Sequence, residues 1–340
     1  MRQQKSYFCC QLSSVRAKNK TRRMEKRMTI IVQFVLLVVG LFMLVKGADL
    51  FVDGASDIAT KFGIPKLVVG LTIVAIGTSL PELSVSITAA TKGNAGITLG
   101  NVLGSNILNV LVILGITSVI VPILIPRTAL KYDIPFCVFI TAVVLAMGWI
   151  GGEIVFWEGM ILLLLFVGYS IYLFFLSRGS IKKEKKEKRP DTMPIWKCLF
   201  FVILGGVCVV VGSDLTVDSA TVIARAAGLS ERIIGLTIVA FGTSLPELVT
   251  SVAAARKGNA DIASGNILGS NIFNILFITG LTATIATIPF EKSFILDLFI
   301  AILALIILWI GSKKHRELRR SCGLIMLAVY AVYFVGLTVL

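Results

Sequence analysis

Apolar residues form long blocks along the whole chain, separated by short polar or charged segments. About 20 consecutive apolar residues are needed for a helix to cross the hydrocarbon core of a bilayer. The pattern therefore predicts an all-α polytopic membrane protein with ten transmembrane helices. We expect the spans at residues 30–53, 66–90, 96–120, 132–151, 155–176, 197–218, 232–255, 261–284, 293–312 and 322–340.

The composition agrees with this class and excludes a soluble enzyme. Of the 340 residues, 56% are hydrophobic and 15% are charged, and the mean hydropathy is +0.91. Soluble domains are typically about 45–50% apolar and about 25% charged. The six cysteines have no metal-ligand spacing, and His315 is the single histidine. We therefore expect no enzyme activity and no cofactor.

The positions of the basic residues predict the topology. The net charge is +14, but the Lys and Arg residues flank the apolar blocks, which is not typical of a nucleic-acid surface. One alternating set of loops holds 19 of these residues and the other set holds 4. Cytoplasmic loops carry the excess. We therefore expect a multi-pass protein of the plasma (inner) membrane, with the 177–196 loop in the cytoplasm and both termini outside.

We expect four parts along the chain, with the hydrophilic 177–196 loop between two halves. These are a basic N-terminal tail at 1–28, a first five-helix repeat at 29–176, a basic cytoplasmic linker at 177–196 and a second five-helix repeat at 197–340. The tail carries nine Lys and Arg residues, which disagrees with an outside location. Three interpretations remain open: translation starts later, at Met24 or Met28; the tail is translocated despite its charge; or the orientation is inverted.

An internal repeat relates the two halves. Residues 70–110 and 235–275 are identical at 29 of 41 positions, with a constant offset of 165 and no gap. The identical residues include Thr, Ser, Pro, Glu and Asn, which chance similarity between apolar helices does not explain. Five helices separate equivalent points, so the second copy enters the membrane from the opposite side. This predicts an inverted-topology repeat, and such repeats place a binding site near the bilayer midplane.

The segment GTSLPE occurs in both copies, at 77–82 and 242–247. Proline lacks an N–H and clashes with the carbonyl four residues earlier, so each segment predicts a bent helix that exposes backbone oxygen. The hydroxyls of Thr78, Ser79, Thr243 and Ser244 add oxygen ligands.

Glu82 and Glu247 end these segments, in the middle of predicted spans. A carboxylate at this depth costs at least ~2.5–3.5 kcal/mol unless it is paired or protonated. Lys and Arg occur in the same spans only at their first residues, Lys66 and Arg232, far from the glutamates. Two carboxylates with neutral oxygens are typical ligands of a hard divalent cation such as Ca²⁺. A protonated glutamate used only for helix packing is the alternative.

A second repeated segment carries hydroxyl and amide side chains. Ser105 and Asn109 share one helix face, as do Ser270 and Asn274. Ligation of a cation and hydrogen bonding between helices are both open for them. Four further amides fit the two interpretations equally well: Asn101, Asn106, Asn266 and Asn271. Close to the helix ends, Asp49, Asp53, Asp214 and Asp218 either attract cations or are solvated charges.

These segments resemble the α-repeats of the calcium/cation antiporter superfamily, in its prokaryotic sodium/calcium exchanger branch. The resemblance rests on the two GTSLPE segments and on GN(V/I)LGSNI(L/F)N at 100–109 and 265–274, and it covers residues 29–340. In that superfamily, oxygen ligands from both repeats hold the ions. The metal ligands that the resemblance implies here are the carbonyls of Ala75 and Ala240, the hydroxyls of Thr78, Ser79, Ser105, Thr243, Ser244 and Ser270, the carboxylates of Glu82 and Glu247, and the amides of Asn109 and Asn274.

The resemblance also implies the function. We expect a secondary active transporter that exchanges Ca²⁺ for Na⁺ by alternating access, at a site between Glu82 and Glu247. Several members carry Asp at the position of Asn274, and potassium-dependent members use that acid, so Na⁺ is the expected counter-ion. Proton- or potassium-coupled antiport and a cation channel are the alternatives. No nucleotide-binding loop or protease motif is present. We expect lipid as the surroundings and a functional monomer.

Overall fold

The computed structural model describes residues 2–184, 193–228 and 240–339. This part of the chain is almost entirely helical, which confirms the predicted all-α class. It contains eight helices that are long and apolar enough to span a membrane, or nine if one bent pair is a single span. The start of the expected span 232–255 and much of the 177–196 linker lie outside the described residues. The expected number of ten therefore stays a prediction.

The first half contains twelve α-helical, π-helical (η) or strand elements before its last long helix, α8. In chain order they are α1 (Arg2–Phe62), α2 (Lys66–Val69), η1 (Gly70–Val74), α3 (Ala75–Thr78), α4 (Leu80–Thr91), α5 (Gly96–Ile107), η2 (Leu108–Leu114), α6 (Gly115–Ile120), β1 (Ile123–Leu124), η3 (Ala129–Asp133), α7 (Ile134–Gly151), β2 (Glu153–Ile154) and α8 (Phe156–Glu184).

The second half repeats much of this order. Its described elements are α9 (Ile195–Ala226), α11 (Ala240–Gly242), α12 (Leu245–Arg256), α13 (Ala260–Ile272), η5 (Phe273–Ile278), α14 (Thr279–Ile285), β3 (Ile288–Pro289), α15 (Ser293–Lys313), β4 (Glu317–Leu318) and α16 (Arg320–Val339). The pairing of β1 with β4, and of β2 with β3, joins segments of different halves. The halves therefore interlock instead of forming separate domains.

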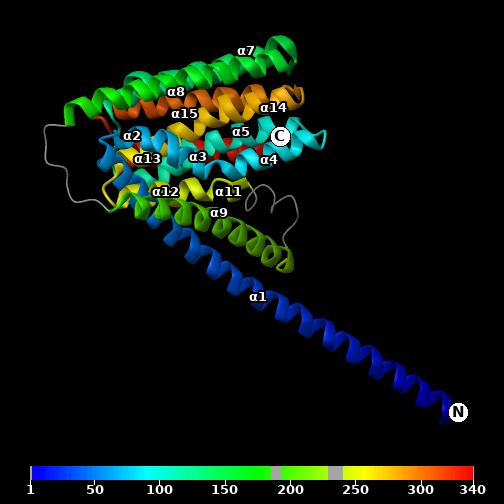
Figure 1. The fold of residues 1–340 in the computed structure, drawn as a ribbon. Coiled ribbons are helices and arrows are strands. Elements are labelled where there is room, and N and C mark those ends of the chain that lie inside the picture. The colour runs from blue at the N-terminus through cyan, green and yellow to red at the C-terminus, as the bar shows by residue number, and fades with distance from the viewer. Residues whose placement is uncertain (1, 185–192, 229–239, 340) are drawn as a thin grey trace.

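Helices α1 and α9 lie side by side along one edge of the bundle, with α7 and α8 at the opposite edge (Figure 1). Glycines make the α1–α9 contact close. A Cβ atom on Gly47 would lie 2.9 Å from the Gly205 carbonyl, and one on Gly212 would lie 2.8 Å from the Gly40 carbonyl. Small residues at such contacts allow two helix backbones to approach within a membrane.

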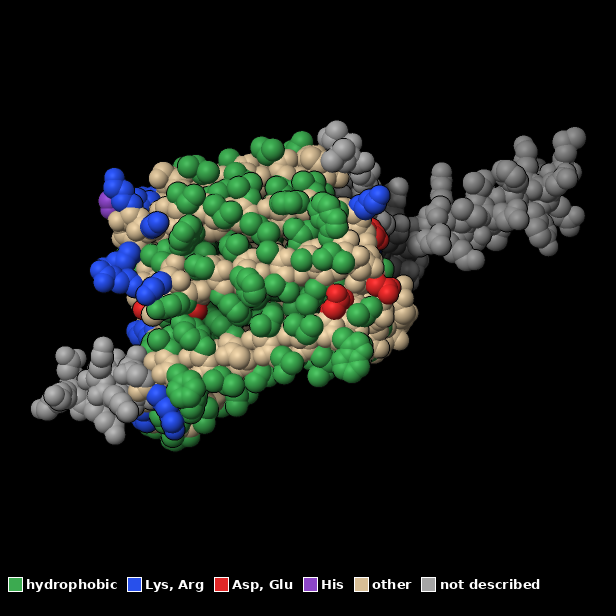
Figure 2. Space-filling model, turned by 90° about the horizontal axis from the view of Figure 1, so that it is seen from above, with side chains coloured by type: hydrophobic (Ala, Val, Ile, Leu, Met, Phe, Trp, Pro, Cys, Tyr) green, Lys and Arg blue, Asp and Glu red, His purple; other side chains and the backbone are tan. Residues whose placement is uncertain are grey.

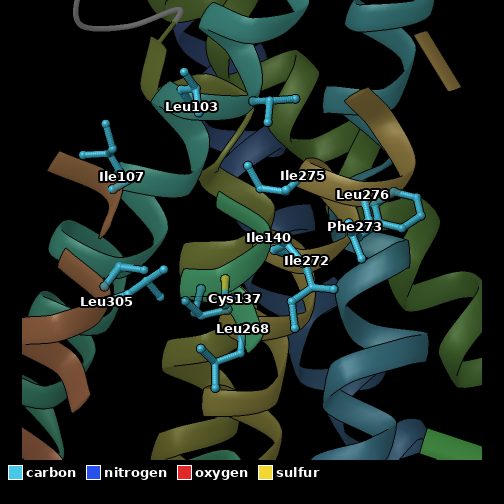
Figure 3. Packing of buried hydrophobic residues seen from close by; sticks show 14 of the residues in the cluster. Leu103, Ile107, Cys137, Ile140, Leu268, Ile272, Phe273, Ile275, Leu276 and Leu305 are labelled. Carbon is cyan, nitrogen blue, oxygen red and sulfur yellow. The ribbon is translucent and has the colours of Figure 1, made fainter. Parts of the chain in front are cut away.

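The centre of the bundle consists of the two helices that carry the repeated amide segment. In the most apolar 18-residue stretch of each helix, 78% of the residues are buried for Gly96–Ile120 and 83% for Ala260–Ile285. The corresponding share is 11–33% in the other described spans. Figure 3 shows Leu103 and Ile107 of α5, and Leu268 and Ile272 of α13, among the packed apolar side chains. The centre is thus packed on all sides, and its polar residues are removed from lipid.

The surface has the character expected of a membrane protein. Green apolar side chains cover the middle of the face in Figure 2, and most of the Lys and Arg side chains on it gather at one end, beside the histidine. This distribution agrees with the asymmetry of basic residues on which the predicted orientation rests.

Candidate ion-binding site

The GTSLPE segments break two helices at the centre of the bundle. The first break lies at Ser79, where the helix up to Thr78 meets α4 at an angle of 48°. The second lies between Gly242, the end of α11, and Leu245, the start of α12. Each proline occupies the first turn of the following helix, where its missing N–H has no intrahelical partner to lose. The predicted bend is therefore present in the first copy, and the second copy shows a helix break at the equivalent place.

The two glutamates lie in the first turn of the helices after the breaks. Glu82 and Glu247 are each 1% exposed. Both sit near helix N-termini, where the aligned peptide dipoles favour negative charge. No Lys or Arg pairs with either carboxylate within the described ranges. Ser79, one helical turn before Glu82, donates to the Glu247 carboxylate, so the two acids lie in the same buried region. The arrangement therefore places two buried acids together without a positive partner.

Each carboxylate faces the helix break of the other half. Ser79 donates a hydrogen bond to Glu247 Oε1 over 2.9 Å, and Ser270 donates to the same oxygen over 3.5 Å. Glu82 lies beside Thr243 and Ser244. The second oxygen, Oε2, of both glutamates is buried and has no hydrogen-bond partner. One oxygen of Glu247 is thus held by hydrogen bonds, while the Oε2 atom of each acid has no partner.

The predicted amides lie in the same buried region. Asn109 and Asn274 are 1% and 0% exposed, and the Oδ1 atom of each has no hydrogen-bond partner. Their Nδ2 atoms are engaged, Asn109 with Asn271 Oδ1 at 3.0 Å and Asn274 with Ser105 Oγ at 3.1 Å. Buried polar oxygens normally have partners. These oxygens are the ones available to a cation.

The remaining predicted ligands differ in how free their oxygens are. Thr78 is buried and donates to Asn266 Oδ1 over 3.1 Å. The Ala75 carbonyl accepts the Ser79 N–H at 3.0 Å and the Ser270 hydroxyl at 3.5 Å. The Ser244 hydroxyl has no partner, whereas Thr243 is only half-buried. Ala240 is the first residue of α11, and its side chain lies outside the described part of the structure.

Of the four amides with two open interpretations, Asn101 and Asn266 each donate to a neighbouring helix of their own half, and Asn266 also accepts from Thr78 of the other half. The Asn101 Nδ2 atom donates to the Glu82 carbonyl at 3.1 Å, and that of Asn266 donates to the Glu247 carbonyl at 3.4 Å. Asn106 and Asn271 bond across the halves, each donating to the other's backbone carbonyl over 3.2 Å. The sequence gives no means to separate these roles, because they depend on which helices meet.

Two contacts near the site were not predicted. Ser213 of α9 donates to the Gly242 carbonyl over 2.9 Å, which gives a partner to the carbonyl at the end of α11, one of the groups that a helix C-terminus leaves without an intrahelical bond. Lys257 binds two of the four aspartates expected at helix ends, with Nζ 3.3 Å from Asp49 Oδ1 and 2.8 Å from Asp53 Oδ1. For Asp49 and Asp53, the solvated-charge interpretation is therefore incomplete, since both charges are paired.

The other two aspartates border a cavity. Asp214 and Asp218 of α9 line a space of about 440 Å³ together with Pro81 and Thr243. The expectation that the four aspartates lie at helix ends is wrong, because α1 continues to Phe62 and α9 to Ala226. Thr243 belongs to the second helix break, so the cavity extends from Asp214 and Asp218 to the edge of the glutamate pair. It provides a route along which a hydrated cation could approach the buried oxygens from one end of the bundle.

The donor set consists of two carboxylates and several neutral oxygens. No cluster of three or more His, Cys, Asp or Glu side chains occurs among the described residues. Hard cations such as Ca²⁺ take oxygen ligands of this kind, whereas softer metals favour Cys or His. The arrangement can therefore bind a hard cation through buried oxygen ligands.

Comparison with known proteins agrees with this chemistry. A family model described as "Sodium/calcium exchanger protein" matches residues 32–175 and 197–339. The sodium/calcium exchanger MaX1 of Methanosarcina acetivorans is 32% identical over 348 residues, which cover 91% of this chain and 99% of that protein. The inner membrane protein YrbG of Escherichia coli is 33% identical over 310 residues, covering 88% and 94%. A solved structure of the sodium-calcium exchanger NCX_Mj superposes with a TM-score of 0.78 at 32% identity, covering 90% and 99%.

Proposed function

The chain belongs to the sodium/calcium exchanger protein family, and we propose that it exchanges Ca²⁺ for Na⁺ across the membrane as a secondary active transporter. The observation that carries this proposal is a set of four buried oxygens without partners, contributed equally by the two halves. They are Glu82 Oε2, Glu247 Oε2, Asn109 Oδ1 and Asn274 Oδ1.

The buried charges supply the driving force for ion binding. Two buried carboxylates with no positive side chain beside them are unfavourable in a membrane interior. One Ca²⁺ or several Na⁺ ions between Glu82 and Glu247 would neutralise them. An empty site would keep both charges unpaired, so switching between the two sides without an ion would be slow. This condition would couple the two ions as exchange and prevent leak.

We propose that the fold is two inverted repeats of five helices, divided as 29–176 and 197–340. Contacts between equivalent residues, which lie 165 positions apart in the chain, support this arrangement. Asn106 and Asn271 exchange equivalent hydrogen bonds, and Gly70 and Gly265 meet at a distance where a Cβ on either would lie 3.0 Å from the other's Cα. An axis through the membrane plane would then pass close to the glutamate pair and put the site near the midplane.

Alternating access is the proposed mechanism, and the two ends of the bundle support it. At one end Lys257 joins α12 to α1 through Asp49 and Asp53. At the other end the equivalent aspartates line an open cavity. The described state would therefore admit ions on the Asp214 side and exclude them on the Lys257 side. The close glycine contact between α1 and α9 would let these helices slide together past the site.

The orientation follows from the basic residues. The 177–196 loop would lie in the cytoplasm and both termini outside, which puts the open cavity on the outer face of the plasma (inner) membrane. Because one chain supplies both halves of the site, we propose that a monomer suffices. The neutral Asn274 favours Na⁺ over K⁺ as the counter-ion.

Counter-ion-dependent ⁴⁵Ca²⁺ uptake into proteoliposomes tests this function. Uptake should require Na⁺ inside the vesicles, and should stop when the Na⁺ gradient is abolished. A K⁺ gradient alone or a pH gradient alone should give no uptake. Ca²⁺ entry that persists without any counter-ion gradient would contradict exchange and indicate a channel.

A further inference from the structure

Four buried amides form one connected set where α5 and η2 cross α13 and η5. We call Asn106, Asn109, Asn271 and Asn274 the amide clasp. All four are at most 3% exposed. Asn106 and Asn271 bind one another's backbone carbonyls, each over 3.2 Å. Their own side-chain oxygens accept from the candidate ligands of the opposite half, Asn271 from Asn109 and Asn106 from Asn274, each over 3.0 Å.

The backbone carbonyls fix the orientation of every amide in the clasp. A carbonyl only accepts hydrogen bonds, so Asn271 must direct its Nδ2 toward the Asn106 carbonyl. Its Oδ1 is then left to face Asn109. Asn109 must in turn present Nδ2 to that oxygen, and because the amide is planar its own Oδ1 points away, without a partner. The same sequence of contacts, started from the Asn271 carbonyl, orients Asn106 and then Asn274.

A second contact fixes Asn274 independently. The Ser105 hydroxyl donates to the Asn101 carbonyl over 2.8 Å, so its oxygen accepts from Asn274 Nδ2 at 3.1 Å. Both donors of the Asn274 amide are thus occupied, and only its oxygen is free. The reverse orientation of either ligand amide would present a partly positive NH₂ group to a cation.

We propose that Asn106 and Asn271 are positioning residues that keep the Asn109 and Asn274 oxygens directed at the transported cation. This inference rests on the proposed function. A carboxylate has two equivalent oxygens and needs no such control, but this chain has an amide at both positions. Because each ligand amide is oriented by the opposite half, the clasp also links the geometry of one half of the site to the other.

The matched control is Asn101, which lies on the same helix as Asn106. It donates to the Glu82 carbonyl and to Ser86 Oγ, at 3.1 Å and 3.0 Å, and does not contact the Asn109 or Asn274 side chain. Asn101→Leu and Asn271→Leu both remove hydrogen bonds between helices. Only Asn271→Leu frees a ligand amide to rotate, so the two variants separate positioning from packing.

The experiment measures Ca²⁺-induced thermal stabilisation of the full chain purified in detergent, beside ⁴⁵Ca²⁺ uptake. A ligand at concentration L that binds only the folded state stabilises it by RT ln(1 + L/Kd), so the melting temperature rises with the logarithm of the ligand concentration above Kd. Both leucine variants should melt earlier without ions. Asn271→Leu alone should raise the Ca²⁺ concentration that gives a fixed rise in melting temperature, by about tenfold, which corresponds to about 1.4 kcal/mol. Asn101→Leu should leave that concentration within about twofold of the wild type.

A double variant gives the stricter test. In an Asn109→Asp background, orientation at position 109 no longer matters, so adding Asn271→Leu should change the Ca²⁺ requirement less than about twofold. An equal effect of Asn271→Leu in both backgrounds, or equal Ca²⁺ curves for the Asn101 and Asn271 variants, would overturn the proposal. If Asn271→Leu does not fold, Asn271→Ser replaces it, and failure of both to fold would assign Asn271 a purely structural role.

The same data separate this inference from the proposed function. If the wild type shows no Ca²⁺-induced stabilisation that Na⁺ competes with, the proposed function fails. If the wild type shows it and the Asn271 variants keep it unchanged, only the positioning role fails.

Discussion

Equivalent positions in the two halves make different contacts at the two ends of the bundle. Lys257 binds Asp49 and Asp53, whereas its counterpart Lys92 is exposed and forms no ion pair within the described residues. The counterparts of the two aspartates, Asp214 and Asp218, line the open cavity. A nearly identical repeat has therefore adopted two local structures. The difference indicates that the structure is one of two states. In the other state, Lys92 could bind Asp214 and Asp218 while Asp49 and Asp53 line an open cavity.

At the centre of the molecule the halves are alike, and there we expect the largest effects. Glu82→Gln and Glu247→Gln should each lower the rate of Na⁺-driven ⁴⁵Ca²⁺ uptake by about 100-fold. Each substitution removes one of the charges that the ion neutralises, and such a charge costs ~2.5–3.5 kcal/mol in the membrane interior when it is not neutralised. The control is Glu153→Gln, at an exposed position in β2, which should retain uptake. A variant of either buried glutamate that transports at the wild-type rate would break the proposed equivalence of the halves.

Substitution of the lysines at the two ends of the bundle should have smaller effects. Lys257→Gln should slow labelling of the cavity, whereas Lys92→Gln should not. Lys257→Gln removes a partly exposed ion pair, worth up to about 1 kcal/mol or about fivefold in an equilibrium. The open-cavity state should become less populated. The labelling rate of Val217→Cys, a cavity position, with an impermeant thiol reagent should fall by about that factor in a chain without its native cysteines.

Lys92→Gln is the matched control for this shift. If Lys92 pairs with Asp214 and Asp218 only in the opposite state, its loss should leave the labelling rate unchanged or increase it. Equal slowing by both lysine variants would contradict the assignment of Lys257 to one state.

The contact between α1 and α9 should respond equally in both halves. A Cβ on Gly47 would lie 2.9 Å from the Gly205 carbonyl, and one on the equivalent Gly212 would lie 2.8 Å from the Gly40 carbonyl. Gly47→Ala and Gly212→Ala should therefore each destabilise the fold by about 1–3 kcal/mol through overpacking. Thermal melting in detergent measures this. Gly168→Ala, at an exposed position of α8, should be neutral or stabilising, and similar losses at all three positions would exclude the close contact as the cause.

The smallest effect concerns a position where the halves differ in sequence. Ser213 supplies the hydroxyl that binds the Gly242 carbonyl, while the equivalent residue of the first half is Ala48. Ser213→Ala should lower the free energy of unfolding by about 1 kcal/mol, since it leaves a buried carbonyl without a partner. Thr216→Val is the control, because the Thr216 hydroxyl bonds only within its own helix. If Ser213→Ala melts at the same temperature as the wild type, the Ser213 hydrogen bond does not stabilise the second half.

The amino-acid sequence predicted the parts of the site that depend on local chemistry. Pro81 and Pro246 mark the helix breaks, and the lack of nearby basic residues identifies Glu82 and Glu247 as an unusual buried pair. The constant offset of 165 indicated that equivalent segments would meet. Each of these inferences needs only residue types and their spacing along one helix.

Other parts depend on which helix faces meet, and the sequence could not supply them. Asn106 and Asn109 are three residues apart and both donate across the halves, yet only Asn109 leaves its side-chain oxygen without a partner. The pairing of Lys257 with α1 joins residues about 200 positions apart. The π-helical segments η2 and η5 were also not predicted. They begin within the amide segments and contain Asn109 and Asn274, and such widened turns often occur at functional sites.

The central claim is that a cation binds between the two halves at the glutamate pair. X-ray diffraction from crystals of the wild-type protein grown with Ca²⁺ tests it directly, through the anomalous signal of the ion. We predict a peak within about 2.3–2.6 Å of carboxylate oxygens from both Glu82 and Glu247, lost in crystals grown with Na⁺ alone. A peak confined to the Asp214 and Asp218 cavity, with none at the glutamate pair, would contradict the account.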